Sequence, residues 1–98
     1  MRELNQLVVL YAKPGREAVL RANLQALVAP SQKEDGNQRY ELYEDAADAR
    51  RFIFLERWAS ADAQSQHHHQ SDHIRHFHEN GDADVGRREI FYILKPVV

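Results

Sequence analysis

The feature that most constrains the fold is the alternating run at residues 51–58, RFIFLERW. In an extended strand, successive side chains point to opposite faces, so Phe52, Phe54, Glu56 and Trp58 would share one face. Ile53 and Leu55 would lie on the other face. Because both faces carry bulky apolar groups, the run indicates a central strand that is covered on both sides.

Glu56 falls on the aromatic face of this run. A carboxylate between Phe54 and Trp58 loses solvation unless it has hydrogen-bond partners or an opening to water. Glu56 is therefore a candidate functional residue. The alternative is a structural ion pair with an arginine on a neighbouring strand, and the pattern leaves both interpretations open.

Composition narrows the class of protein. The 98 residues predict one domain over residues 1–98, which buries only about two thirds of its unfolded surface and would gain from a partner subunit. A net charge of -2 argues against a nucleic-acid partner. The absence of cysteine excludes disulfides and thiolate metal sites. The longest apolar run, Leu7–Ala12, is too short to cross a bilayer, and the first residues lack a signal-peptide core. We expect a cytoplasmic protein without a membrane partner.

The rest of the chain alternates between strand and helix patterns. Apolar spacing predicts an amphipathic helix from Arg16, and Pro30 should break or kink it at Ala29. A capping box at residues 31–34 could then start one more short turn. Ser60 resembles an N-cap for a helical region that ends at Gly81 and divides into two short helices near Ser71. Strands are predicted at residues 7–12, 39–44 and 89–94, with a hairpin loop of about six residues at 45–50.

This order predicts an α+β fold, a ferredoxin-like βαββαβ antiparallel sheet with both helices on one face. The first, third and fourth strands are apolar on both faces. The face without helices should therefore be buried by a second copy of the chain, as a homodimer. The sequence leaves open whether Ile90, Tyr92 and Leu94 or Phe91 and Ile93 face the partner.

Six histidines fall within residues 67–78. On one continuous helix, His69, His73 and His76 would share a face, where neutral imidazoles can hold zinc, copper or nickel. A helix break at Ser71 would separate them, and the segment from His69 to His73 lacks the glutamate of a metalloprotease motif. We therefore predict no metal site.

Several patterns occur together in one order along the chain. They are Tyr-x-Leu-Tyr-x-Asp from Tyr40, Phe-x-x-x-Glu-x-Trp ending at Trp58, and a His-x-x-Ser-x-His segment ending at His73. In this order and spacing the chain resembles antibiotic biosynthesis monooxygenase (ABM) domains, the small dimeric α+β barrels that include quinol monooxygenases. The resemblance covers nearly the whole chain.

The resemblance implies that O2 oxidises a quinol- or phenol-like aromatic substrate without metal, flavin or haem. A hydroquinone that loses a proton readily donates an electron to O2, so the protein need only bind, deprotonate and shield it. By this resemblance His73 is the base or anion partner, and His68 and Glu56 are further catalytic candidates. The implied substrate-binding residues are Trp58, Tyr40, Phe54 and Phe77.

Some alternatives stay open. The chain carries one residue more than the family pattern between Trp58 and the paired histidines, so His67 or His68 could hold the first histidine position. The fold alone also permits a non-catalytic barrel that binds a small apolar ligand, or a metal- or haem-dependent enzyme.

Overall fold

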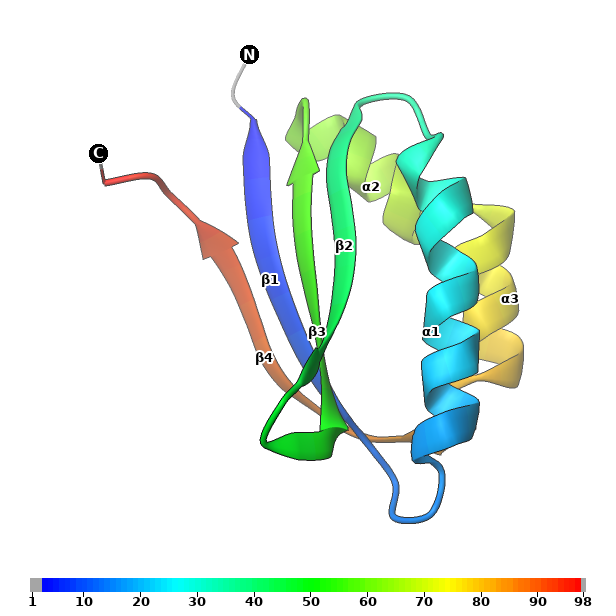
Figure 1. Ribbon diagram of the computed structural model, residues 1–98. Coiled ribbons are helices and arrows are strands. Elements are labelled where there is room, and N and C mark those ends of the chain that lie inside the picture. Colours follow the sequence, from blue (N-terminus) through cyan, green and yellow to red (C-terminus); the bar gives the residue numbers. More distant parts are fainter. Residues whose placement is uncertain (1–2, 98) are drawn as a thin grey trace.

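The computed structural model describes residues 3–97 as an antiparallel sheet with the helices packed on one face (Figure 1). The elements are β1 (Leu4–Ala12), α1 (Glu17–Gln32), β2 (Asn37–Asp45), β3 (Asp48–Trp58), α2 (Ala61–Gln70), α3 (Asp72–Asn80), the 3-10 helix η1 (Asp82–Asp84) and β4 (Val85–Leu94). The strand order is β2-β3-β1-β4. The predicted ferredoxin-like α+β fold is confirmed.

The alternation in β3 gives the sheet its two faces. Phe52, Phe54, Glu56 and Trp58 are all buried on the face that the helices cover. Ile53 and Leu55, on the open face, keep intermediate exposure. β3 lies between β1 and β2, so the prediction of a central strand is confirmed.

The helices complete the core from the covered side. α1 buries Leu20, Leu24 and Leu27, and α3 buries Ile74 and Phe77. Full burial of one such side chain contributes about 1.5–3 kcal/mol, so the apolar stripes of the helices hold them against the sheet. In the part of the chain that the structure describes, no helix is both long and apolar enough to span a membrane.

The expected break at Pro30 is wrong, because α1 continues to Gln32. Proline lacks an amide hydrogen and so removes one hydrogen bond of the helix. At position 30 it does so within the last turn, and a break there would shorten the helix by that turn only. The tertiary contacts of that turn outweigh this loss. Ser31 is fully buried, and the amide of Lys33 bonds to the carbonyl of Pro30. The capping box at residues 31–34 does not form a further helix.

The predicted six-residue hairpin loop is also wrong. β2 ends at Asp45 and β3 begins at Asp48, so only two alanines form the turn. The Asp45 carboxylate accepts a hydrogen bond from the amide of Ala47, and the Asp48 carboxylate accepts one from Arg50. Because of these local bonds, polar residues that the sequence places in a loop continue the hydrogen-bonded pairing of β2 with β3.

The two short helices of the histidine-rich region are confirmed. Ser60 caps α2 by accepting a hydrogen bond from the amide of Ala63. Ser71 separates α2 from α3 with an extended backbone. Gly81 follows α3, and a Cβ there would lie 2.7 Å from the ring of Phe77, so this close approach requires glycine.

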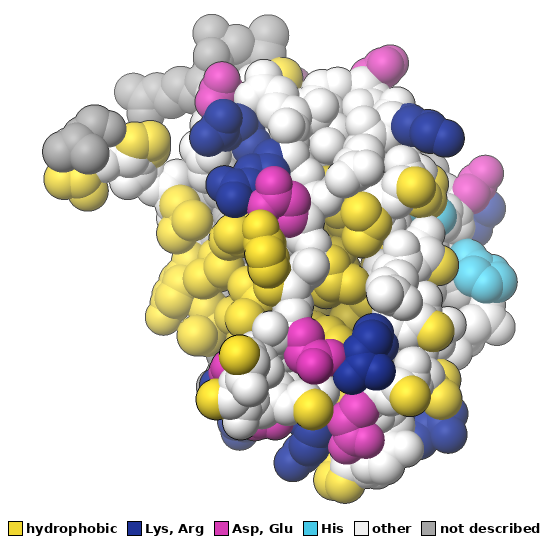
Figure 2. Space-filling view, viewed as in Figure 1, with side chains coloured by type: hydrophobic (Ala, Val, Ile, Leu, Met, Phe, Trp, Pro, Cys, Tyr) yellow, Lys and Arg dark blue, Asp and Glu magenta, His cyan; other side chains and the backbone are white. Residues whose placement is uncertain are grey.

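The open face of the sheet and β4 expose a large apolar surface. Phe91, Tyr92, Ile93 and Leu94 are 60%, 55%, 57% and 42% exposed. Hydrophobic side chains gather on the side of the molecule where β1 and β4 lie (Figures 1 and 2). The register pairs Tyr92 with Leu7 and Phe91 with Val8, which places Tyr92 on the open face and Phe91 on the helix side.

Candidate active site

A single carboxylate joins the two helices of the histidine-rich region. Glu34 Oε2 lies 2.7 Å from His67 Nδ1 of α2, and Glu34 Oε1 lies 2.8 Å from His73 Nε2 of α3. The Ser71 hydroxyl donates a further hydrogen bond to Glu34, and the Ser31 hydroxyl lies 3.0 Å from His73 Nε2. We call these five residues the Glu34 cluster.

Local structure explains why the cluster can form. Glu34 lies in the turn between α1 and β2, where Gly36 adopts a φ of +83°. A Cβ on Gly36 would lie 2.6 Å from Cβ of Ala63 in α2, so glycine lets this turn pack closely on α2. The interruption at Ser71 redirects α3, and His73 can then reach the same carboxylate as His67.

Aromatic rings form the wall behind the cluster. The ring of His67 lies 4.6 Å from that of Trp58 and 5.3 Å from that of Tyr40, between centroids. Tyr40 also packs on Phe54 at 5.1 Å. Burial raises the pKa of the Tyr40 phenol far above its ordinary value. The phenol therefore stays neutral, and it acts as a hydrogen-bonding and packing group rather than as a base.

Burial also sets the protonation of His67. It lowers the pKa of this imidazole, and the neighbouring Glu34 carboxylate opposes the effect. The side chain is only 5% exposed, so we regard desolvation as the stronger influence and expect a neutral ring at pH 7.

Glu56 lies beside this wall without an arginine partner among the described contacts. Its Oε1 accepts hydrogen bonds from Gln6 Nε2 at 2.8 Å and from Trp58 Nε1 at 3.0 Å. Burial raises the pKa of Glu56, and the two donors oppose this rise. Oε1 of Gln6 is buried and has no hydrogen-bond partner among the described residues.

We expect Glu56→Gln to stabilise the protein increasingly as pH rises above about 4.5. The folded state raises the pKa of Glu56 above the ordinary 4.5, so the folded protein holds this proton more tightly than the unfolded chain does. Stability is therefore lost as pH rises above the ordinary pKa of Glu56, because its carboxyl group must then ionise in a buried position and close to the Glu34 carboxylate. The glutamine amide is neutral and its oxygen can still accept both bonds.

Thermal denaturation of parent and variant from about pH 4 to about pH 8 measures this effect. Glu79→Gln, at an exposed position of α3, is the matched control. Its stability relative to the parent should not change with pH. Equal pH dependence in the parent and Glu56→Gln proteins would contradict the prediction.

The structure brings five predicted site residues into the cluster or its wall, places Phe77 beside His73 in a neighbouring groove and leaves His68 apart. His73, Glu56, Trp58, Tyr40 and Phe54 all belong to the cluster or to the wall behind it. His68 is exposed on α2, with its ring 4.8 Å from His69 and 6.1 Å from His78. Phe77 is buried between α3 and the core. The catalytic and binding roles of all seven stay predictions.

Sequence reasoning missed Glu34, Ser31 and Gln6 as site residues. Two signals were available. Ser31 and Glu34 lie just after the predicted helix, in a pattern that predicts a capping box, and Gln6 is a single polar residue beside an apolar strand. The sequence alone permits either His67 or His68 at the first histidine position. The structure joins His67, and not His68, to the Glu34 cluster.

Two hollows open beside the cluster. A groove of about 370 Å³ between α1 and α3 is lined by His73, His76 and Phe77, together with Ala26, Leu27 and several polar residues. A cleft of about 220 Å³ is lined by Glu34, His67 and Ser71. Trp58, Tyr40 and Phe54 are at most 4% exposed, so His73 and Phe77 are the predicted site residues that a ligand in the groove could touch.

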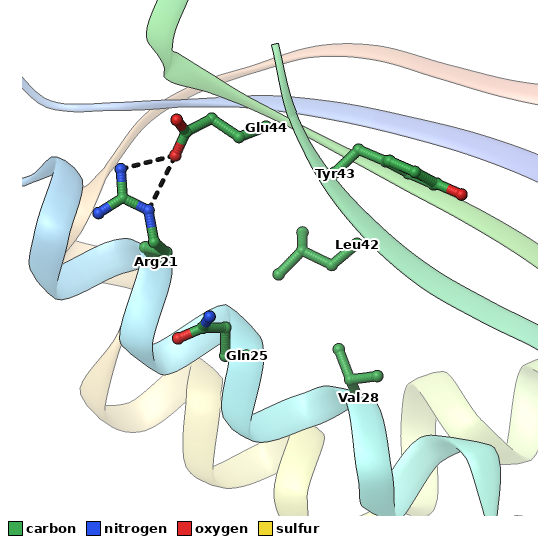
Figure 3. Close-up of a pocket in the computed structure, with 6 residues that line it drawn as sticks. All are labelled: Arg21, Gln25, Val28, Leu42, Tyr43 and Glu44. Atoms are coloured by element: carbon green, nitrogen blue, oxygen red, sulfur yellow. Dashed lines mark hydrogen bonds and ion pairs between the residues drawn. The ribbon is translucent and has the colours of Figure 1, made fainter. Parts of the chain in front are cut away.

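A third hollow lies between α1 and β2, and it shares no lining residue with the other two. It measures about 360 Å³, and Leu42 and Val28 face each other across it (Figure 3). Two bonds between Arg21 and Glu44, of 2.8 and 2.6 Å, close one end. The charged groups are paired with each other, and no histidine lines this hollow, so it offers no base for proton transfer.

Comparisons with known proteins agree with the fold. The model of the family described as "Antibiotic biosynthesis monooxygenase" matches residues 4–80. "Putative monooxygenase YcnE" of Bacillus subtilis is 30% identical over 69 residues, which are 70% of this chain and 72% of that protein. The crystal structure of PA3566 from Pseudomonas aeruginosa has a TM-score of 0.92 and 28% identity, over 100% of this chain and 97% of that one. Rv0793 from Mycobacterium tuberculosis has a TM-score of 0.88 and 26% identity, over 99% and 97% of the two chains.

Proposed function

The chain belongs to the antibiotic biosynthesis monooxygenase family, whose model matches residues 4–80, and we propose that it oxidises a quinol- or phenol-like aromatic with O2 and without a resident cofactor. For a hydroquinone, one oxygen atom would enter the ring and the other would leave as water. A hydroquinone and O2 would thus give a hydroxyquinone and water, and the substrate would supply all four electrons. The protein would bind the substrate and move its proton.

The observation that carries the proposal is the position of His73 between Glu34 and the groove. A carboxylate accepts hydrogen bonds, so in a neutral His73 ring the nitrogen that faces Glu34 would carry the hydrogen and Nδ1 would carry the lone pair. His73 lines the groove between α1 and α3. A phenol bound there would give its proton to Nδ1, and Glu34 would stabilise the resulting imidazolium.

The lining of the groove supports an aromatic substrate. Phe77, Ala26 and Leu27 supply an apolar lining, and Asn23 and Asn80 supply polar groups at its margin. An aromatic ring could pack on Phe77 while its hydroxyl reaches His73. Trp58, Tyr40 and Phe54 would support the histidines from behind, and direct contact between these three rings and the substrate would require them to move.

Oxygen uptake tests the proposal directly. The purified protein, treated with a chelator, would be screened against hydroquinones and phenols with an oxygen electrode, and products formed under isotopically labelled O2 would be analysed by mass spectrometry. One labelled oxygen atom in the product is the expected result. Binding of aromatics without turnover would overturn it and favour a ligand-binding barrel.

We further propose that two copies pair through the open face of the sheet. Leu7, Val9, Ile53, Leu55 and Tyr92 share this face, as the strand register places them. Leu94 of β4, 42% exposed, extends the same face, whereas the register places Phe91 and Ile93 on the helix side. A contiguous apolar surface of this kind marks an interface, and a second copy would bring an identical apolar surface.

Tyr92→Glu is expected to dissociate this dimer. A carboxylate at that position would be buried without a partner, which costs about 3–5 kcal/mol and weakens association at least about 100-fold. Tyr92 is 55% exposed in the single chain, so the monomer should still fold. Sedimentation at micromolar concentration measures the effect.

Val19→Glu is the control for this variant, because Val19 is also an exposed apolar residue, 38% exposed, but lies on α1. It should sediment like the parent. A parent protein that sediments as a monomer would contradict the proposed pairing.

A further inference from the structure

Three potential metal ligands converge in the Glu34 cluster. A carboxylate oxygen of Glu34 and one ring nitrogen each of His67 and His73 lie within 4.8 Å of one another. Among the side chains that the structure describes, no other group of three or more His, Cys, Asp or Glu converges in this way. Two imidazoles and one carboxylate are a ligand set that suits zinc and other divalent transition metals.

The spacing suits a small ion. Ligand atoms of a tetrahedral ion with bonds of about 2.1 Å stand about 3.4 Å apart. The two contacts to Glu34, 2.7 and 2.8 Å, would lengthen by about 0.6 Å to reach this separation, and the histidine nitrogens would turn toward a common centre. The ligands come from three different elements, so small shifts of α2 and α3 can supply this adjustment.

The surroundings meet two further requirements of a metal site. The cleft of about 220 Å³ beside Glu34, His67 and Ser71 gives an ion access from solvent and leaves room for a bound water. The hydroxyls of Ser31 and Ser71 contact the ligands and could orient them.

From this geometry we infer that Glu34, His67 and His73 form a binding site for one divalent transition-metal ion. The site differs from the helical face of His69, His73 and His76 that the sequence suggested, because the break at Ser71 separates α2 from α3. It replaces the expectation that the chain has no metal site.

Metal binding goes beyond the proposed oxidation and would compete with it. An ion would take Nε2 of His73, the nitrogen through which Glu34 orients the ring. The ring proton would then reside on Nδ1, the atom proposed to accept the proton of the substrate. The metal-bound form and the base-competent form of the cluster therefore exclude each other.

Calorimetric titration of the chelator-treated protein with Zn²⁺ tests the inference without any activity measurement. We expect one ion per chain with a dissociation constant of about 1 µM or below. Glu34→Gln retains the shape of the side chain but loses its charge, and it should weaken binding about 100-fold or more. The double variant His69→Ala/His76→Ala removes two exposed histidines of α2 and α3 and should bind like the parent.

Binding of Co²⁺ to the unmodified protein is a second measurement. It tests for the metal site even if Glu34→Gln fails to fold. A four-coordinate site with histidine ligands gives intense visible absorption, whereas Co²⁺ held by exposed histidines and water gives weak absorption. Intense bands that Zn²⁺ abolishes in a one-to-one ratio would support the site. Weak bands, or loss of Zn²⁺ binding in the double variant with retention in Glu34→Gln, would overturn it.

Discussion

Replacing His73 with alanine is expected to lower the rate of hydroquinone oxidation about 10² to 10⁴-fold, the usual range for loss of a general base. The variant loses the nitrogen that would accept the proton of the substrate, while Glu34 keeps His67 and Ser71 as partners. The fold should remain intact, because His73 is partly exposed. Steady-state oxygen uptake measures the effect, which should fall mainly on kcat.

Three comparisons show whether the loss reflects base catalysis. Free imidazole added to the His73→Ala protein should restore part of the rate, because it can occupy the vacated space and accept the proton. His69→Ala, at an exposed position of α2, should oxidise substrate like the parent. If His68→Ala is inactive while His73→Ala is fully active, the base is His68, and if both are active, the base lies elsewhere.

Replacing Trp58 with alanine is expected to destabilise the protein by about 3–5 kcal/mol, the usual cost of a large cavity in a core. Trp58 is fully buried and packs against Tyr40 and His67. Its removal also deprives the buried Glu56 of the hydrogen bond from Nε1. Urea denaturation monitored by circular dichroism measures the loss.

Trp58→Phe separates the two contributions to this loss. Phenylalanine retains much of the packing but cannot donate to Glu56, so it should destabilise less than alanine, and the deficit should shrink at low pH, where Glu56 is protonated. Val19→Ala, at an exposed position of α1, should change stability by no more than about 0.5 kcal/mol. A Trp58→Ala protein as stable as the parent would show that the wall behind the histidines contributes little to the fold.

The two variants together test whether chemistry and stability are separable in this domain. His73 is attached to the cluster by polar contacts at a solvent-accessible groove, whereas Trp58 is part of the core. We therefore expect loss of rate without loss of stability at His73 and loss of stability at Trp58. A similar division is common where catalytic side chains are carried on a rigid scaffold.

The sequence by itself determined the elements and their faces. The alternation from Phe52 to Trp58 and the helical spacing of Leu20, Leu24 and Leu27 report periods of two and 3.6 residues, which are properties of a single element. The order of those elements then restricts the topology to few choices. Ser60 marked the start of α2 because capping depends on neighbouring residues alone, whereas the hydroxyl of Ser71 caps neither helix and donates to the distant Glu34.

Only the tertiary structure decided which residues meet at the site. His67 and His68 are neighbours on one helix and point about 100° apart, so the packing of α2 determines which of them faces Tyr40 and Trp58. Glu34 lies 33 positions from His67 and joins it only when the turn after α1 packs on α2. Contacts between distant positions depend on how whole elements are placed, and no local period in the sequence records that placement.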